Sequence, residues 1–262
     1  MGSVKAPRRR VALGVLVPSL CAAVLGLLVL RPACAEDSGG VRRVELARFA
    51  NVQPGNSLPA AWVHQTLPSV ERANRFDIVK DGGVSVLRVI SDRSASSLLA
   101  VQRVDLAATP LLRWRWRVSR PVSASDLRRK AGDDYAARVY VLFDLPSERL
   151  SVGDRMKMMT ARLLYGSDLP AAALCYVWGT AQSVGESGWN AYSDRLRMIV
   201  VDSGATHAGQ WREVVRDVAA DFRAAFGDPL MPVTGVALGA DTDNTGERVE
   251  ARFADLSFET YP

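Results

Sequence analysis

Hydrophobic residues follow a two-residue period along most of this chain, and that period is typical of β-strands. The clearest case is 111–118, LLRWRWRV, where Leu112, Trp114, Trp116 and Val118 alternate with three arginines. One face of such a strand is apolar and the other basic. We therefore expect both tryptophans to lie in a core and the arginines to face away from it.

Eight further segments have the β-branched, aromatic or alternating character of strands. They are 85–90, 97–104, 135–143, 172–178, 195–203, 211–218, 233–239 and 251–259. In 135–143 the expected core face begins at Tyr135 and ends at Phe143, while Arg138 and Tyr140 point the other way.

Only two stretches favour a helix. The first is 154–166, where apolar residues recur at helical spacing before a glycine. The second is 217–227, with Asp217 as the N-cap and Gly227 after the end. Strands separated by turns, with two short helical excursions, predict an all-β chain folded as an antiparallel, jelly-roll-like β-sandwich.

The first 35 residues have the layout of a secretory signal peptide. A basic start is followed by the uncharged run 11–30 and by Ala33-Cys34-Ala35, a small-residue cleavage site. We expect cleavage before Glu36, which leaves 36–262 as a single β-sandwich domain in the periplasm or outside the cell. The alternative is an uncleaved anchor, since twenty uncharged residues can span a bilayer; this is the one expected route to a membrane.

Setting this segment aside changes the charge balance. Five of the 33 basic residues and none of the 28 acidic ones lie in 1–35, so the remainder carries 28 of each. The basic balance therefore does not indicate nucleic acid as a partner. One cysteine, Cys175, remains in an apolar run, which favours a buried structural thiol.

The stretch 239–247, GADTDNTGE, separates two strand-like runs and concentrates oxygen-bearing side chains. It matches the first half of an EF-hand calcium loop, but Arg252 stands where the closing glutamate belongs, so that motif is excluded. Asp241 and Asp243 remain candidate ligands for calcium in another geometry. The plainer interpretation is a hairpin loop joining the last two strands, whose side chains cap their own backbone.

A second acidic cluster precedes the strand at 135–143. If the strand direction holds through Asp134, then Asp134, Arg138 and Tyr140 project from one face. Such a face could hold a sugar by bidentate hydrogen bonds and stacking. Asp133 or Asp134 would also have to complete any calcium shell at 239–247. The alternative is an Asp–Arg pair that only braces the sheet.

Aromatic residues offer a further candidate for sugar binding. Trp178 and Trp189 lie at the two ends of a glycine-rich loop and are expected to be exposed stacking platforms. Motifs of a nucleophilic serine, a zinc protease, a paired-cysteine site or a phosphate-binding glycine loop do not occur. Paired carboxylates could still perform acid–base chemistry on a glycan.

Several motifs together resemble one family. WRWRV, GDDYAARVYVLFD, GQW, DFRAAFG and ADTDNTGE with FADLSF occur in order between about residues 45 and 259. Together they resemble the bacterial exported family called domain of unknown function 3047, which implies export but no activity. The ending DTDNTG with FADLSF is also distantly similar to the last hairpin of galactose-binding jelly rolls, a likeness of fold that does not carry function.

We therefore expect a non-catalytic sandwich that binds a saccharide or another polar component of the cell envelope. The candidate ligand-binding residues are Asp133, Asp134, Arg138, Tyr140, Trp178, Trp189 and Asn244. The candidate metal ligands are Asp241 and Asp243, with calcium as the ion. Two alternatives stay open: a hydrolase or lyase acting on a glycan through two carboxylates, and a structural or assembly protein with a protein partner.

Overall fold

The computed structural model describes residues 41–262 except 56, 67–68, 150–152 and 154–169. Gly40–Pro262 form one unit. Both the expected signal peptide and the helix expected at 154–166 lie outside the described residues, so each stays a prediction. Within the described part of the chain, no helix is long and apolar enough to cross a bilayer.

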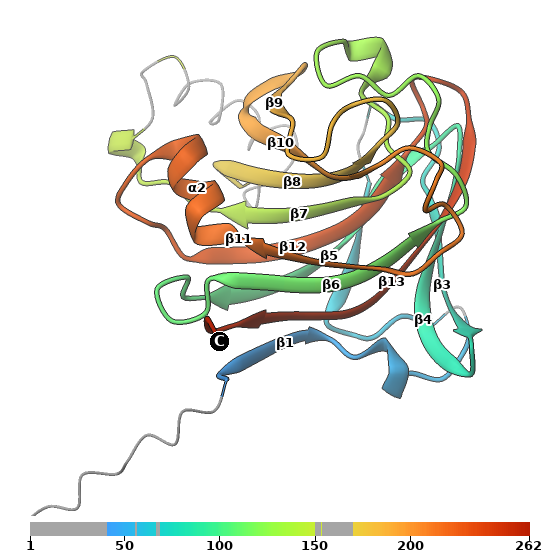
Figure 1. Cartoon of the computed structure of the whole chain (residues 1–262), viewed down its shortest axis with the longest axis horizontal. Coiled ribbons are helices and arrows are strands. Elements are labelled where there is room, and N and C mark those ends of the chain that lie inside the picture. Colours follow the sequence, from blue (N-terminus) through green and yellow to red (C-terminus); the bar gives the residue numbers. More distant parts are fainter. Residues whose placement is uncertain (1–40, 56, 67–68, 150–152, 154–169) are drawn as a thin grey trace, which may run out of the picture. The chain divides into compact units, whose positions relative to one another are not determined.

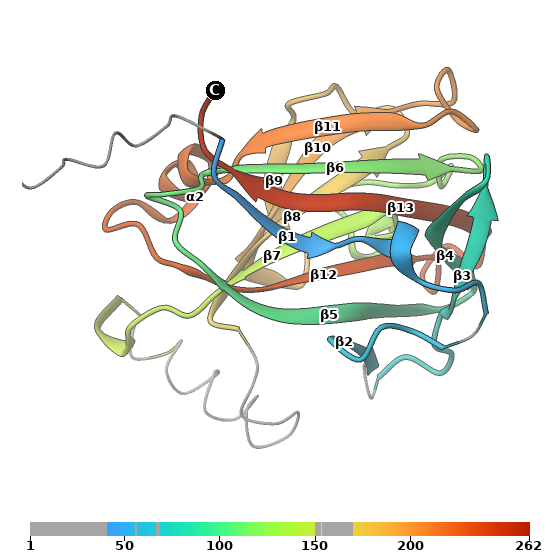
Figure 2. The same cartoon turned by 90° about the horizontal axis from the view of Figure 1, so that it is seen from below.

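Two twisted sheets pack face to face (Figures 1 and 2). The six-stranded sheet contains β1 (Arg43–Ala47), β3 (Arg75–Asp81), β4 (Val84–Asp92), β6 (Leu111–Val118), β11 (Arg212–Asp217) and β13 (Arg248–Glu259). The seven-stranded sheet contains β2 (Trp62–Thr66), β5 (Ala95–Val104), β7 (Arg138–Phe143), β8 (Ala172–Gly179), β9 (Ser187–Asn190), β10 (Ser193–Ser203) and β12 (Val233–Asp241). One helix, α2 (Val218–Phe226), and three short 3-10 turns complete the described elements.

The prediction of an all-β, jelly-roll-like sandwich is confirmed, and all nine predicted strands occur. One pairing departs from the antiparallel expectation, because β8 and β10 run parallel. Four strands were missed: β1, β2, β3 and β9. Three of these are short, and the alternation of β3 is masked by Asp77, which is buried because it pairs with Arg88 at 2.6 Å.

Aromatic side chains from both sheets meet in the core. Trp114 and Trp116 of β6 are fully buried, as predicted, and their rings lie 5.5 Å apart in an edge-to-face arrangement. Across the interior, Trp114 packs on Tyr176 of β8 at 5.4 Å and Trp116 packs on Trp178 at 5.8 Å. Tilted and edge-to-face contacts of this kind add to the burial of large apolar area, so this cluster holds the two sheets together.

Strand β8 is buried on both faces. Its residues alternate between the main core, which takes Tyr176 and Trp178, and a smaller cluster on the outer face of the seven-stranded sheet, which takes Cys175 and Val177. Tyr135 belongs to this outer cluster. The expectation that it faces the main core is wrong because β7 begins only at Arg138, so the two-residue alternation does not extend back to 135.

The second predicted helix is confirmed as α2, with both of its ends. The Asp217 side chain accepts a hydrogen bond from the backbone N–H of Ala220 at 2.9 Å, and Gly227 follows the last turn with a φ of 73°. Phe222 of α2 packs on Phe143 at the end of β7, with ring centres 4.7 Å apart. The helix therefore covers the end of the sandwich at which β7 finishes (Figure 1).

The loop at 239–247 joins the last two strands, as expected, but it is not a hairpin. β12 belongs to the seven-stranded sheet and β13 to the six-stranded sheet, so residues 242–247 cross from one sheet to the other. We call residues 242–247 the arch. Turn-forming residues show that the chain reverses, but they do not show whether the next strand pairs with its predecessor or faces it from the other sheet.

Removing one of the central rings tests the core. Trp116→Ala should lower the free energy of unfolding by about 3–5 kcal/mol, because it empties a large, fully buried site between the sheets. Urea denaturation measures the change. The matched control is Trp189→Ala, which deletes the same atoms at a position that is 40% exposed and should cost about 1 kcal/mol. Equal losses in both variants would contradict this account of the core.

Candidate functional site

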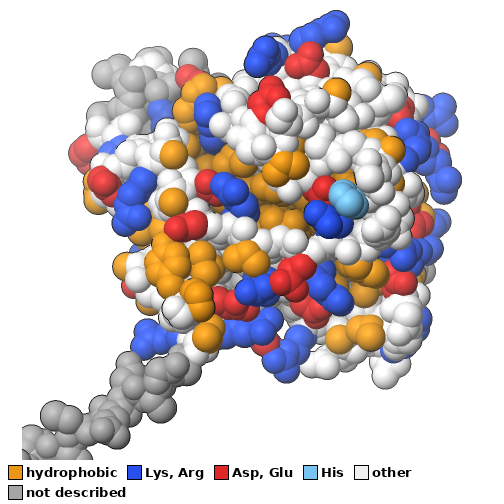
Figure 3. Space-filling view, in the orientation of Figure 1, with side chains coloured by type: hydrophobic (Ala, Val, Ile, Leu, Met, Phe, Trp, Pro, Cys, Tyr) orange, Lys and Arg blue, Asp and Glu red, His pale blue; other side chains and the backbone are white. Residues whose placement is uncertain are grey.

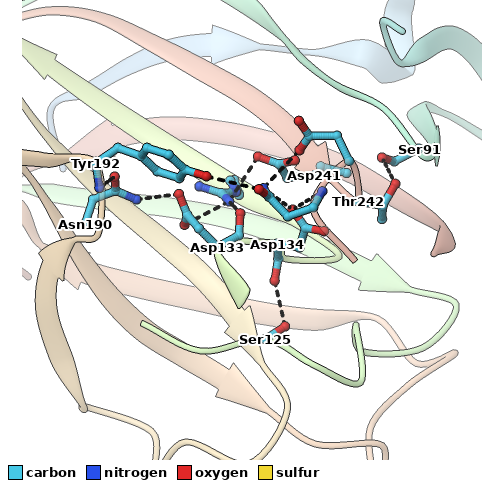
Figure 4. Close-up of polar contacts among 12 residues, drawn as sticks. Ser91, Ser125, Asp133, Asp134, Asn190, Tyr192, Asp241 and Thr242 are labelled. Atoms are coloured by element: carbon cyan, nitrogen blue, oxygen red, sulfur yellow. Dashed lines mark hydrogen bonds and ion pairs between the residues drawn. The ribbon is translucent and has the colours of Figure 1, made fainter. Parts of the chain in front are cut away.

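Three loops meet over the outer face of the seven-stranded sheet, beside the start of β7 and the end of β12. They are the 119–137 connection before β7, the turn between β9 and β10, and the arch. Figure 4 shows Asp133, Asp134, Asn190, Tyr192 and Asp241 converging there. The two acidic segments identified in the sequence therefore lie at the same end of the sandwich, although more than a hundred residues separate them.

Arg138, the first residue of β7, is the centre of this arrangement and is only 2% exposed. Its Nη2 donates to the backbone oxygen of Asp133 at 2.6 Å and to that residue's Oδ1 at 3.2 Å, and it lies 3.1 Å from Oδ2 of Asp241. Its Nη1 donates to the Tyr140 hydroxyl at 3.3 Å. A buried guanidinium is tolerated here because two carboxylates and an acceptor surround it.

Asp133 carries the same network into the loop after β9. Its Oδ2 accepts a hydrogen bond from Nδ2 of Asn190 at 2.7 Å. Oδ1 of Asn190 in turn accepts from the backbone N–H of Tyr192 at 2.9 Å, the pattern of an Asx turn. Arg138, Asp133 and Asn190 thus connect the loop before β7 with the turn after β9 and, through Asp241, with the end of β12.

Asp134 is fully buried and anchors the arch. Its Oδ2 accepts from the backbone N–H and the hydroxyl of Thr245 at 2.6 and 2.7 Å, and its Oδ1 accepts from Nδ2 of Asn244 at 3.0 Å. The expectation that Asp134 shares a face with Arg138 and Tyr140 is therefore wrong. The chain leaves strand geometry before β7, so its neighbour Asp133 turns to the arginine instead.

Three carboxylates face one another beside the arch. One oxygen each from Asp134, Asp241 and Asp243 lies within 4.8 Å of the others. Burial raises the pKa of Asp241 well above its ordinary value of 3.8, the neighbouring Asp243 and Asp134 raise it further, and Arg138 acts in the opposite direction. Oδ1 of Asp241 is buried without a hydrogen-bond partner among the described residues. A proton or a cation would satisfy that oxygen.

Beneath this network lies the outer apolar cluster. Burial raises the pKa of the Cys175 thiol to about 12 and raises the pKa of Tyr140 well above its usual value. Both groups therefore stay protonated at neutral pH. Cys175 is a buried free thiol, as predicted, and a protonated thiol is a poor nucleophile.

The exposed part of the site is a rim formed by Lys130, Tyr192, Asp243 and Asn244. Tyr192 is 57% exposed, and its hydroxyl lies 3.1 Å from Oδ1 of Asn244. The ammonium of Lys130 lies 4.9 Å from the centre of the Tyr192 ring. A ligand at this end of the sandwich would meet these side chains before it met Arg138 or Asp133.

The two tryptophans proposed as platforms do not belong to the site. Trp178 is fully buried in the main core, and its indole N–H donates to the backbone oxygen of Gly204 at 3.0 Å, so the expectation of exposure is wrong. Trp189 is exposed, but its ring lies between Phe226 at 5.7 Å and the guanidinium of Arg197 at 5.3 Å. Because Trp189 and Asn190 are successive residues of β9, they point to opposite faces.

Sequence reasoning missed Asn190, Tyr192 and Ser125. Ser125 donates to the backbone oxygen of Asp134 at 2.6 Å and fixes the turn before β7. The segment WNAYSD at 189–194 contains an asparagine just before the predicted strand 195–203, and asparagine in such a position favours an Asx turn. No local pattern shows that this turn reaches Asp133.

Comparison with known families gives one match. Residues 60–257 match the family described as "Protein of unknown function (DUF3047)". Comparison of the sequence with curated proteins gives no match.

Solved structures with a similar architecture include three enzymes. A cellulase variant derived from Cel12A of Rhodothermus marinus shares 10% identity, with 84% of this chain and 100% of that chain covered and a TM-score of 0.38. A family 12 xyloglucanase from Bacillus licheniformis shares 7% identity, with 84% of this chain and 99% of that chain covered and a TM-score of 0.43. The xyloglucanase domain of NopAA from Sinorhizobium fredii, in complex with cellobiose, shares 10% identity, with 79% of this chain and 98% of that chain covered and a TM-score of 0.41.

At these identities and TM-scores the likeness extends to general architecture alone. The three are a cellulase variant and two xyloglucanases rather than the galactose-binding jelly rolls to which the last two strands were compared.

The raised pKa of Asp241 gives stability a definite dependence on pH. The folded state keeps a proton that the unfolded chain releases above pH 3.8. The contribution of Asp241 to the free energy of unfolding is therefore complete at lower pH and is lost as pH rises through the pKa of the folded state. Asp241→Asn mimics the protonated form at every pH. In the presence of a chelator, the variant should therefore gain stability relative to the wild type as pH rises, measured by urea denaturation.

An exposed aspartate provides the control for this comparison. Asp194→Asn should show no such trend, because Asp194 lies on the surface. If the wild type instead becomes more stable relative to Asp241→Asn as pH rises, the ion pair with Arg138 outweighs the effect of burial.

Proposed function

The chain belongs to the family described as protein of unknown function DUF3047, whose description assigns no activity, and from its loop site we propose that it is an exported binding protein. It binds a saccharide or another hydroxyl-rich component of the cell envelope at the rim and does not transform it. A calcium ion held by Asp241, Asp243 and Asp134 forms part of the binding site. Export follows from the N-terminal segment and is part of the proposal.

The convergence of three carboxylates supports the calcium site. Calcium binds oxygens at about 2.3–2.6 Å, so two of its ligands can lie at most roughly 5 Å apart. The oxygens of Asp134, Asp241 and Asp243 lie within 4.8 Å of one another and meet that limit. Two of these aspartates are contributed by the chain around the arch and one by the loop before β7, so the fold supplies the ligand that the 239–247 stretch lacks.

Local charge also favours a cation. The cluster contains four aspartates, Asp133, Asp134, Asp241 and Asp243, but only one buried guanidinium, that of Arg138, which pairs with Asp133 and Asp241; Lys130 lies at the rim. Acidic groups are thus in excess within the cluster. A divalent ion would balance that excess, and it would occupy the free Oδ1 of Asp241.

The open side of the cluster suits a hydroxyl-rich ligand. Asp243 and Asn244 are exposed beside the Tyr192 ring, so a carboxylate, an amide and an aromatic surface border the same edge of the arch. Sugar hydroxyls can complete a calcium shell and can also pair with an amide, while an aromatic ring packs against their C–H faces. Arg138 and Tyr140 support the site from below and do not contact the ligand.

Hydrolysis by the same carboxylates is less well supported. A raised pKa at Asp241 beside Asp243 is what a general acid requires. However, the paired carboxyl groups of retaining glycosidases lie about 5–5.5 Å apart and those of inverting ones about 6.5–9.5 Å. Oxygens within 4.8 Å are close to the retaining spacing, but both oxygens of Asp134 accept hydrogen bonds and Asp241 pairs with the buried Arg138, so only Asp243 is open to a substrate.

Calcium should raise the melting temperature. At a free concentration a hundred times the dissociation constant, binding to the folded state adds about 2.7 kcal/mol, which corresponds to roughly 5–10 °C for a domain of this size. Thermal unfolding is followed with calcium and with a chelator. Asp241→Asn should abolish the rise and Asp194→Asn should retain it. A melting curve indifferent to calcium would remove the ion from the proposal.

Glycan binding is tested separately on an array of envelope and plant polysaccharides, with and without calcium. We expect binding that depends on calcium and weakens by about tenfold in Asn244→Ala, the loss of a hydrogen bond with a charge-assisted partner. The control is Trp189→Ala, which should bind normally because its ring faces α2. Turnover of a bound polysaccharide would replace the binding proposal with the hydrolase alternative.

A further inference from the structure

A second site lies on the other side of the arch. A pocket of about 510 Å³ opens between the start of β3, the end of β4 and the start of β13. Three arginines, Arg72, Arg75 and Arg248, line it together with Asp92 and Ser94. In Figure 3 basic side chains gather along the right-hand margin, where β3 and β4 lie in the same view of Figure 1.

The charges of this pocket are unbalanced. Asp92 is its one carboxylate, and that side chain is already shared by two arginines, Arg93 at 3.3 Å and Arg248 at 3.7 Å. Arg72 and Arg75 form no ion pair with any described residue. The pocket therefore has a net positive charge and two guanidinium groups that are free to bind an anion.

This excess contrasts with β6, which lies in the same six-stranded sheet. There the arginines of β6 are each matched with a carboxylate: Arg113 with Glu259 at 3.0 Å, Arg115 with Asp255 at 2.8 Å and Arg117 with Asp81 at 3.2 Å. Paired arginines of this kind are an ordinary solvated face. The unmatched pair at the pocket departs from that pattern within the same sheet.

The floor of the pocket is fixed by buried hydrogen bonds. Ser94 is 2% exposed, and its hydroxyl donates to Oδ1 of Asn74 at 2.8 Å. Nδ2 of Asn74 donates to the backbone oxygens of Ser96 and Ala240, both at 2.7 Å. Arg93, between Asp92 and Ser94, has a φ of 50°, an uncommon value for a residue with a side chain. A floor held in this way needs little reorganisation when a ligand binds.

We propose that this pocket binds an anionic group, a phosphate or a carboxylate carried by the ligand, between Arg72, Arg75 and Arg248. Planar guanidinium groups pair with both anions through two parallel N–H···O bonds, which gives geometry as well as charge. Phosphate-bearing envelope components and acidic sugars share this chemistry. The site is independent of calcium, because none of its lining residues belongs to the carboxylate cluster.

Titration calorimetry at low ionic strength, in the presence of a chelator, tests the proposal with two probes. One probe is inorganic phosphate and the other is a short oligomer of galacturonate. We expect saturable binding of at least one, weakened about tenfold by Arg72→Gln and by Arg75→Gln, since each loses a charge-assisted pair. Asp92→Asn should tighten binding, because it removes the one competing carboxylate.

Arg103→Gln is the matched control. Arg103 is exposed, forms no ion pair with a described residue and lies outside the pocket, so its loss removes the same charge elsewhere. The affinity of the Arg103→Gln variant for each probe should equal that of the wild type. Phosphate binding alone would assign a phosphate-bearing ligand, and galacturonate binding alone an acidic sugar. Binding of neither probe, or equal weakening by Arg103→Gln, overturns the proposal while leaving the calcium site untouched.

Discussion

The end of the sandwich depends on the burial of one charge. Arg138 is almost fully removed from water, and an unpaired ion in that position would cost several kcal/mol. Its partners come from two distant segments, Asp133 before β7 and Asp241 at the end of β12. Asp133 also accepts from Asn190, and its neighbour Asp134 accepts from Asn244 and Thr245 of the arch, so the residues before β7 bond to both of the other loops. We infer that the loops order together rather than one by one.

Much of the fold could be predicted because local patterns decide it. The alternation of β6 assigns Trp114 and Trp116 to the core, and α2 begins and ends at the residues that cap it. The hydrophobic pattern fails where the outcome depends on which elements pack against a strand. The arch shows this: turn residues mark a reversal, but only tertiary packing places β12 and β13 in different sheets. Trp178 is a second example. Both faces of β8 are buried, so its apolar sequence does not distinguish a residue of the main core from one on the outer face.

The candidate site was predictable as a set of residues but not as a set of contacts. Asp133, Asp134, Arg138, Asp241 and Asn244 do lie at one end of the sandwich. Which aspartate meets the arginine could not be derived, because the alternation that assigned Asp134 to Arg138 assumes a strand that has already ended there. The aromatic residue at the rim is likewise Tyr192, on a short turn, rather than either tryptophan.

The arch keeps two opposite charges apart. On one side lie Asp241 and Asp243, and on the other the arginines around Asp92. Between them Thr242 is buried: its hydroxyl bonds to that of Ser91 at 2.7 Å, and its backbone N–H donates to the backbone oxygen of Ser94 at 3.0 Å, so neutral groups rather than ions fill the boundary. Direct pairing across the arch would neutralise both groups and leave nothing for a ligand.

Neutral hydrogen bonds at the boundary have the opposite effect. They fix the arch with groups whose own charge is zero, so the acidic cluster and the basic pocket each keep their excess charge. A buried hydroxyl network that is fully satisfied also holds its shape without the long-range attraction that would draw the two sides together. The placement of Thr242, Ser91 and Ser94 therefore makes the proposed cation site and the proposed anion site compatible on one short segment of chain.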